Sequence, residues 1–600
     1  MNNQKNRESY WVKKCILVGL GFVFLLSACT STEKLVSSDW YEIKSQHFRI
    51  VTNGNPKKVQ KLAEDLEQFR IFSQKYIAFQ SDQQSLTIYA LADQLSFARV
   101  NGSKNERNVI GSFRNTSYGS FALVNIRGNR YFPDNPARKI LFHEYTHFLT
   151  YSRSSYNYPY WYSEGLAESF STVRFNGKNV FEVGRMPVDR AISLSQLKQL
   201  PLKRLLEATR GSLDEQEAEA LYASGWMLTH WLLFDPERKL ALERYLKAYQ
   251  TGADSVTALP NALDMTFDEL EAQYQLLSKS DFVYFSGQIS ESRNISSALI
   301  KPMMRETAIA EIAHFMAITR QKPSVLQDFF KSAKQKGVVS PPLQAALAIS
   351  ESQAGNFFLA KEILKEVEKK YRRESWYLEA DAKISLTEAL AKNGELDVNE
   401  IASLRDQYVH LVNTQEHIPA YWHELAITMQ LLGYPREQYL EMLEQAYWRA
   451  PRDINIAWWF VRELYVSRDK KLFPYVAHPL LMQIYNKKSR AYLKSMIREM
   501  EQEQELNVTS ELTAGGLGEM LAEYHQLSGN KALALAIDYS GAYAVGYVGK
   551  SYSQAEAKNF ALKACEERRA NYSVRDACTI YAEGNDILDS AAAIITPVIN

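Results

Sequence analysis

The segment spanning residues 137 to 150 contains the feature that most constrains this chain, the pentapeptide His143-Glu144-Tyr-Thr-His147. Apolar residues flank the pentapeptide and no proline or glycine interrupts it, which predicts a buried helix. Residues i and i+4 of a helix lie on one face, about one turn apart. Both imidazoles can therefore reach a single tetrahedral Zn²⁺ ion. Glu144 lies beside them, where it can take a proton from a metal-bound water.

Length and charge limit the classes of protein to which the chain can belong. Its 600 residues are too many for a single hydrophobic core and predict several domains. The 70 basic and 69 acidic residues nearly balance, so the overall charge gives no reason to expect nucleic-acid binding.

The N-terminus has the pattern of an export signal. Basic residues precede an apolar run at 16–26 that is too short to span a bilayer, and the run ends in Leu26-Ser-Ala-Cys29. This ending resembles a bacterial lipobox. The resemblance implies that residues 1–28 are a signal peptide and that Cys29 carries lipid, followed by a polar tether at 29–39. The alternatives are an ordinary signal peptide and an uncleaved anchor.

The expected location follows from the same segment. Thr30 follows the cysteine, in place of the aspartate that resembles an inner-membrane retention signal. We therefore expect a lipid anchor in the cell envelope, in the outer membrane facing the periplasm if the organism is Gram-negative. In such an oxidising compartment Cys565 and Cys578 form an even pair, which predicts a disulfide. The alternative is two separate buried thiols.

A third metal ligand is expected from the segment at 159–168, Pro-Tyr-Trp-Tyr-Ser-Glu164-Gly-Leu-Ala-Glu168. A catalytic zinc site needs a third protein ligand and one open position. The pattern W-x-x-E-G-x-A resembles the gluzincin peptidases, particularly M1-related and peptidase MA-like domains, and implies that Glu164 is this ligand. Glu168, one turn later, is a candidate to orient His143. The alternative is a solvated Glu164 and two packed core histidines.

Two further residues are candidates to stabilise the oxyanion that forms when water attacks a carbonyl. Tyr222 and the glycine three residues later resemble the Y-x-x-G segment of M1 enzymes, and His230 follows on about the same helical face. The alternative is that both side chains pack helix against helix. We also expect the strand at 120–126 to lie along the cleft. The G-x-M-E-N exopeptidase motif of the M1 family is missing, which favours an endopeptidase.

The second half of the chain predicts two other domains. Residues 300–500 contain small residues, turn glycines and amphipathic helices that resemble tetratricopeptide (TPR) repeats with an irregular period. Such repeats bind protein partners on a concave face, and the alternative is a spacer without a ligand. A polar linker is expected at 501–531. Residues 532–600 have a β-β-α-β pattern with one cysteine on the helix and one on the last strand.

These observations predict a multidomain, mainly α protein. It would consist of an α+β gluzincin-type peptidase domain at 40–285, a TPR-like helical domain and a small disulfide-pinned α+β domain. The expected activity is zinc-dependent hydrolysis of peptide bonds in envelope proteins or peptides. The alternative is a binding or assembly lipoprotein that uses its TPR-like repeats and has a non-catalytic zinc site.

Overall fold

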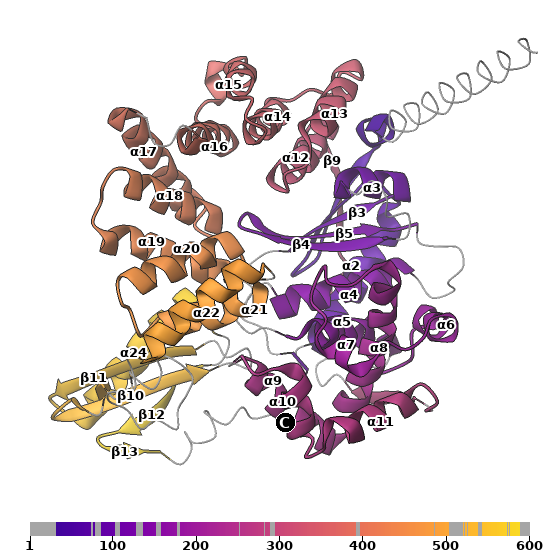
Figure 1. Ribbon diagram of the computed structural model, residues 1–600. Helices are drawn as coiled ribbons and strands as arrows, with labels where there is room; N and C mark the ends of the chain where they lie inside the picture. The colour runs from indigo at the N-terminus through magenta and orange to yellow at the C-terminus, as the bar shows by residue number, and fades with distance from the viewer. Residues whose placement is uncertain are drawn as a thin grey trace, which may run out of the picture.

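The computed structural model describes residues 32 to 588 with gaps at 74–75, 78–85, 103–108, 128–135, 152–157, 177–179, 251, 281, 289–294, 392–396, 485, 503–519, 521–522, 525, 538–542, 573 and 575–576. The expected signal peptide, Cys29 and most of the expected linker at 501–531 lie outside the described residues. The described part is mainly helical with three small sheets, as expected for a multidomain, mainly α protein (Figure 1). None of its helices is long and apolar enough to cross a bilayer.

A six-stranded sheet organises the first domain, with strand order β4-β5-β3-β2-β1-β9. Its strands are β1 (Trp40–Lys44), β2 (Arg49–Thr52), β3 (Leu86–Leu91), β4 (Gly111–Thr116), β5 (Gly119–Asn125) and β9 (Leu299–Met303). β5 is paired on both sides, parallel to β3 and antiparallel to β4. The strand at 120–126 therefore cannot pair with a substrate peptide, because a strand with two partners has no free edge for an added strand. Among the described residues, the edge strands of this sheet are β4 and β9.

The helices of this domain surround the sheet. They are α2 (Pro56–Ser73), α3 (Gln94–Asn101), α4 (Pro136–Tyr151), α5 (Tyr160–Ser171), α6 (Val188–Gln196), α7 (Leu202–Leu206), α8 (Glu215–Leu233), α9 (Pro236–Gln250), α10 (Ser255–Ala262) and α11 (Phe267–Leu277). Side chains of β3 alternate between two apolar cores, as a strand requires. Ile88 and Ala90 lie in the core that α2, α4 and α5 cover. Tyr89 and Leu91 lie in a second core with α12 (Arg305–Ile318). The helical region thus begins directly on one face of the sheet.

The boundary expected between residues 285 and 300 does not separate two units. β8 (Phe285–Gln288) pairs with β7 (Val180–Val183), which also pairs with β6 (Arg174–Asn176). β9 then pairs antiparallel with β1. The chain returns to both sheets before it enters the helical region, so the first domain extends to Met303. These pairings join strands far apart in sequence, which local patterns do not reveal.

Residues 32 to 37, which we expected to belong to a polar tether, form a short helix. Leu35 and Val36 are fully buried in the second core. Trp40 Nε1 donates a hydrogen bond to the Leu35 carbonyl at 3.2 Å. Two apolar side chains in a polar stretch are enough to dock this segment because an apolar surface lies within reach at the start of β1.

The helical region forms a curved series of packed helices that leads from the sheet to the C-terminal module (Figure 1). After α12 come α13 (Pro323–Gln335), α14 (Pro341–Gln353), α15 (Phe357–Lys365), α16 (Ser375–Ala391), α17 (Val398–Thr414), α18 (Pro419–Leu431), α19 (Arg436–Arg449), α20 (Ile454–Val466), α21 (Phe473–Gln483) and α22 (Lys487–Gln502). Gly355 and Gly433 follow helices with φ of 86° and 73°, a conformation that glycine adopts without steric cost. These turns reverse the chain between successive helices.

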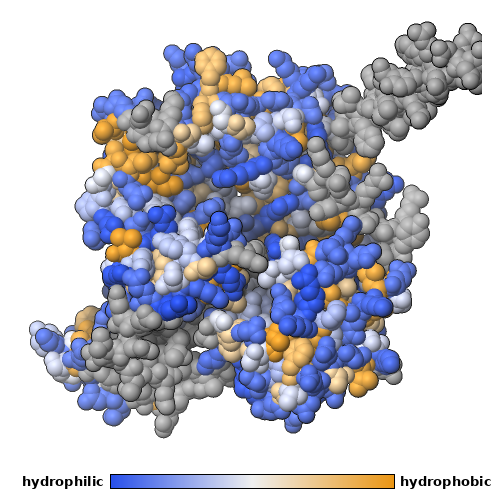
Figure 2. All heavy atoms as spheres, in the orientation of Figure 1, coloured by the Kyte–Doolittle hydropathy of each residue, from blue (hydrophilic) through white to orange (hydrophobic). Residues whose placement is uncertain are grey.

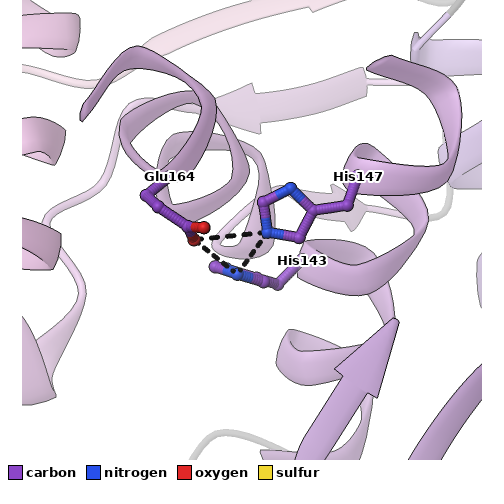
Figure 3. A group of neighbouring side chains, drawn as sticks. All are labelled: His143, His147 and Glu164. Carbon is purple, nitrogen blue, oxygen red and sulfur yellow. Dashed lines mark hydrogen bonds and ion pairs between the residues drawn. The ribbon is translucent and has the colours of Figure 1, made fainter. Parts of the chain in front are cut away.

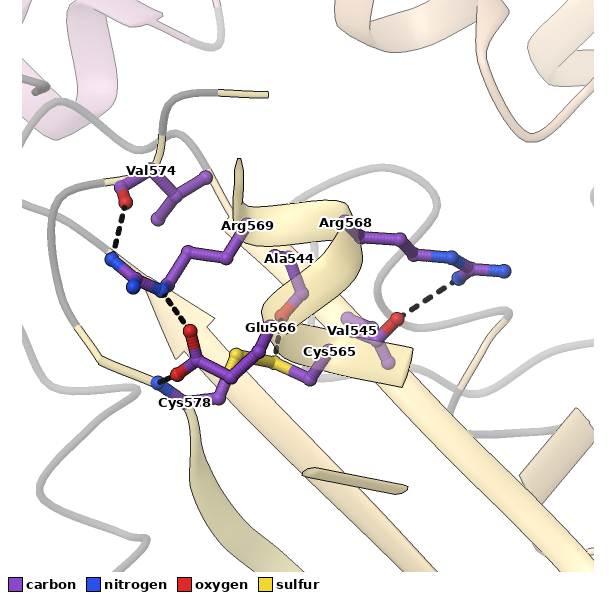
Figure 4. The surroundings of a disulfide bond; sticks show 8 residues. All are labelled: Ala544, Val545, Cys565, Glu566, Arg568, Arg569, Val574 and Cys578. Carbon is purple, nitrogen blue, oxygen red and sulfur yellow. Dashed lines mark hydrogen bonds and ion pairs between the residues drawn. A yellow bond between two sulfur atoms is a disulfide. The ribbon is translucent and has the colours of Figure 1, made fainter. Parts of the chain in front are cut away.

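The C-terminal module is a four-stranded sheet, in the order β11-β10-β12-β13, with a long helix packed on one face. Its elements are β10 (Asn530–Ile537), β11 (Tyr543–Ser551), α24 (Gln554–Tyr572), β12 (Thr579–Glu583) and β13 (Asp586–Ile587). The disulfide predicted between Cys565 and Cys578 is present and joins α24 to the segment before β12 (Figure 4). Glu566 accepts a hydrogen bond from the Cys578 backbone N–H at 2.8 Å, which holds the same segment.

Replacing both Cys565 and Cys578 with alanine should destabilise this module by about 3 kcal/mol, because the disulfide closes a loop with a sequence separation of 13 and restricts the unfolded chain. Hydrogen exchange of the β10 amides in the full chain measures the loss. A reductant added to the wild-type protein should have the same effect. Unchanged protection of β10 in the double variant would contradict the prediction.

Candidate metal centre

Helix α4 is held in place by the side that faces α2 and the sheet. Phe142 stacks on Phe69 with ring centroids 4.1 Å apart, and Tyr145 packs edge-on against Phe48 at 5.1 Å. These aromatic contacts fix the rotation of the helix about its axis. The two histidines of the pentapeptide are thereby presented toward α5.

Helix α5 supplies Glu164 and is buried along most of its length. It crosses α8 at two glycines. A Cβ on Gly165 would lie 2.3 Å from the Gly225 carbonyl oxygen, and one on Gly225 would lie 2.7 Å from the Trp161 carbonyl oxygen. Helix backbones approach this closely only where side chains are absent. The glycine after Glu164 therefore sets the distance between α5 and α8 and the position of the carboxylate.

The side chains of His143, His147 and Glu164 converge on one point (Figure 3). The two Nε2 atoms are 3.0 Å apart, and Glu164 Oε2 lies 3.4 Å from the Nε2 of His143 and 3.2 Å from that of His147. Ligand atoms about 2.0–2.1 Å from a tetrahedral zinc ion are about 3.3–3.4 Å from one another. The three atoms thus have the spacing of three corners of a zinc coordination tetrahedron.

The electrostatics of this group favour positive charge at the cluster. Burial by itself raises the pKa of Glu164, but the two imidazoles lower it well below the usual range for a glutamate. Burial likewise lowers the pKa of His143, but its hydrogen bonds to Glu164 and Glu168 raise it to about 10. A buried carboxylate facing imidazoles requires positive charge nearby, from a proton or from a metal ion. The donor set of two imidazoles and one carboxylate suits zinc.

Glu168 lies behind the cluster, with its Oε1 3.4 Å from His143 Nδ1. Arg190 Nη2 donates to the same oxygen at 2.7 Å, and Lys139 Nζ lies 3.8 Å from the other oxygen. Although burial opposes ionisation, these two cations hold the pKa of Glu168 well below its usual range. The carboxylate can therefore accept the Nδ1–H of His143, so that loss of the proton on Nε2 to a metal would leave the Nε2 lone pair toward the cluster.

Arg190 and Lys139 are functional candidates that the sequence reasoning missed. Arg190 comes from α6, and no motif links it to the pentapeptide. Lys139 precedes His143 by one helical turn, so its i,i+4 spacing was the only signal available. Both act on one candidate ligand, His143, through Glu168.

The side chain of Glu144 extends from α4 toward Gly111, the first residue of β4. It is only 8% exposed, and a Cβ on Gly111 would lie 3.0 Å from its Oε1. Burial raises the pKa of Glu144, although the two histidines act in the opposite direction. A carboxylate whose pKa is raised toward neutral pH is a more effective proton acceptor. Gly111 leaves space beside this carboxylate.

Tyr222 borders the cluster on the side of α8. Its ring centroid lies 6.3 Å from that of His143, and the Arg190 guanidinium lies 4.8 Å from the centre of its ring. The negative charge of Glu164, together with burial, raises the pKa of Tyr222 well above its usual value. The hydroxyl is therefore protonated at neutral pH and available as a hydrogen-bond donor.

His230, our second candidate for the same role, lies in a different environment. Its Nε2 is 2.9 Å from the Val283 carbonyl oxygen, and its ring packs against Trp226 and Phe282 with centroids 5.2 and 5.1 Å apart. Burial lowers its pKa, so it is neutral at neutral pH. Of the two candidates, Tyr222 is the one that the structure brings to the cluster.

The chain matches no known family model, no curated protein and no solved structure. The resemblance to gluzincins therefore depends on the two motifs at 143–147 and 159–168. Function is inferred below from the geometry and chemistry of these residues.

Proposed function

We propose that this protein is a zinc-dependent metallopeptidase held at a membrane by lipid. The observation that carries the proposal is the convergence of His143, His147 and Glu164, with the acid Glu144 on the same helix. Structural zinc sites have four protein ligands, whereas catalytic sites have three and an open position. The group among the described residues that could hold a metal ion has three possible ligands.

The proposed mechanism assigns a task to each residue of the site. Zinc bound there supplies a Lewis acid for a water molecule and for the substrate carbonyl. Glu144 accepts the proton of the attacking water and later delivers it to the leaving amine. The Tyr222 hydroxyl donates a hydrogen bond to the carbonyl oxygen as that oxygen gains charge. Glu168, held by Arg190, keeps His143 in the tautomer that offers Nε2.

An extended peptide is the substrate that the surroundings favour. Among the described residues β4 has one strand partner, so an added strand could pair with its other edge, and the first residue of β4 lies against Glu144. β5 carries no glutamate that could bind a substrate's α-amino group. We therefore propose cleavage within chains, in envelope proteins or peptides.

Metal analysis combined with a protease assay tests this function. We expect about one zinc ion per purified chain, together with cleavage of casein that a chelator stops and added zinc restores. Chain termini in the products distinguish internal cleavage from trimming. Zinc bound without any turnover, together with a co-purifying partner, would favour the alternative described below.

Membrane attachment through Cys29 is part of the proposal. Thr32 is 1% exposed and follows Cys29 by three residues, a span of at most about 11 Å. Lys34 forms an ion pair with Asp93, just before α3. Glu33 forms an ion pair with Lys336, just after α13. A lipid on Cys29 would thus hold this end of the protein close to the bilayer, which we propose is the outer membrane facing the periplasm.

The alternative, a binding or assembly lipoprotein, is supported by one surface. Figure 2 shows apolar side chains gathered over the part of the helical region that contains α15 and α17. Phe358 is 81% exposed and Val398 is 67% exposed. An exposed apolar patch such as the one in Figure 2 is typical of protein-binding surfaces. Capture of a specific envelope protein that Phe358→Ser abolishes, without any zinc-dependent cleavage, would favour this function.

A further inference from the structure

The turn between β4 and β5 reaches away from the sheet and inserts into the helical region (Figure 1). The Ala420 backbone N–H, in α18, donates to the Ser117 carbonyl oxygen at 2.7 Å. The Tyr118 ring packs edge-on against His314 of α12 and Tyr421 of α18, with centroids 6.2 and 6.1 Å apart. Tyr118 contacts two separate apolar cores, the one shared with the sheet and the one formed by α16 to α22.

Tyr118 also completes a buried polar network. Its hydroxyl donates to Glu424 Oε1 at 3.2 Å, and Lys383 Nζ donates to the same oxygen at 2.7 Å. The Lys383 ammonium lies 4.8 Å from the centre of the Tyr118 ring. A buried carboxylate is stable only with such partners. The helical region therefore contains charges that depend on the hairpin turn for part of their compensation.

A second pair, Glu379 and His314, lies next to the Tyr118 ring and extends this network. Glu379 lies 2.8 Å from His314 Nε2 and accepts a hydrogen bond from the Tyr421 hydroxyl at 3.0 Å. Both rings that enclose Tyr118 are thus held by one buried carboxylate. The site for the turn is built from α12, α16 and α18 together.

The same hairpin carries one of the two edge strands of the sheet. Within the part of the chain that the structure describes, β4 has a single strand partner, β5. At its start it is held by α4, where Gly111 faces Ile140 and Glu144. At its end it is held by the helical region through Tyr118. A strand with a single partner is readily displaced unless other contacts hold it.

We infer that Tyr118 is a positioning residue through which the helical region holds β4 in line beside α4, so that this region forms part of the peptide-binding cleft. The role of β4 in substrate binding rests on the proposed peptidase function, whereas the clamp on the hairpin does not. The concave side of the helices, at this point, is occupied by a segment of the same chain.

Hydrogen exchange of the full-length Tyr118→Ala variant tests the clamp. We expect exchange at Gly111–Thr116 to accelerate at least about tenfold while the amides of α4 and β10 keep their protection. Tyr118→Phe keeps the ring and loses only the hydroxyl. Its exchange rate at 111–116 should therefore lie between those of wild type and Tyr118→Ala. Unchanged exchange at 111–116 in Tyr118→Ala overturns the inference. If Tyr118→Ala loses protection throughout the chain, exchange at 111–116 in Tyr118→Phe is compared with wild type. Faster exchange in Tyr118→Phe supports the inference, and equal exchange overturns it.

Casein cleavage tests the consequence for substrate binding. Tyr118→Ala should raise KM for casein at least about tenfold and leave kcat and zinc content within about twofold. The reason is that, in the proposal, β4 binds the substrate peptide and does not take part in bond cleavage. A fall in kcat with unchanged KM overturns the positioning role. No cleavage by the wild-type protein would instead refute the proposed function, and the exchange measurement would still decide whether the clamp exists.

Discussion

Glu144→Gln should abolish hydrolysis and leave zinc bound. Glutamine has nearly the same shape as glutamate, so the helix and the ligands of Figure 3 keep their places. It cannot accept a proton, and loss of a general base lowers rates by about 10²–10⁴-fold. The loss should appear in kcat, measured on casein, with metal content measured on the same sample.

The matched control is Glu237→Gln, an exposed glutamate of α9 in the same domain. It makes the same chemical change away from the site and should keep full activity. Cleavage by Glu144→Gln at the wild-type rate would rule out the proposed mechanism. Loss of zinc in Glu144→Gln would instead show that this carboxylate helps to hold the metal.

Gly165→Ala should disrupt the metal centre without touching any ligand. The added Cβ would lie 2.2 Å from Thr229 Oγ1 and 2.3 Å from the Gly225 carbonyl oxygen, so α5 and α8 must separate. Overpacking of this kind destabilises a protein by about 1–3 kcal/mol or more. Because Glu164 is the preceding residue, the shift should also weaken zinc binding. Thermal unfolding and zinc affinity measure the two effects.

A double variant identifies which contact destabilises Gly165→Ala. Thr229→Ala removes the hydroxyl that the new methyl group would meet but leaves the Gly225 carbonyl in its way. Gly165→Ala/Thr229→Ala should therefore remain destabilised and deficient in zinc. Full recovery in the double variant would show that the two helix backbones have room for a side chain, contrary to the structure.

Local sequence patterns determined the parts of this protein that depend on neighbours along the chain. The i,i+4 spacing brings His143 and His147 to one helical face whatever surrounds them. Local patterns at 532–583, including a capping box at Ser553 and Glu556, predicted the strands and the helix of the C-terminal module. The pairing of Cys565 and Cys578 was predicted because two cysteines remain after the expected signal peptide and lipidated Cys29, in a compartment that the N-terminus predicts to be oxidising.

Contacts between distant segments were decided only by the tertiary structure, because they depend on which surfaces meet. The open edge of the sheet is β4 and not β5, since β5 takes a partner on each side. Arg190 reaches Glu168 from another helix, and Tyr222 rather than His230 faces the cluster. Such choices carry no periodic signal in the sequence. The sequence therefore determined which residues could hold a metal, and long-range packing decided what surrounds them.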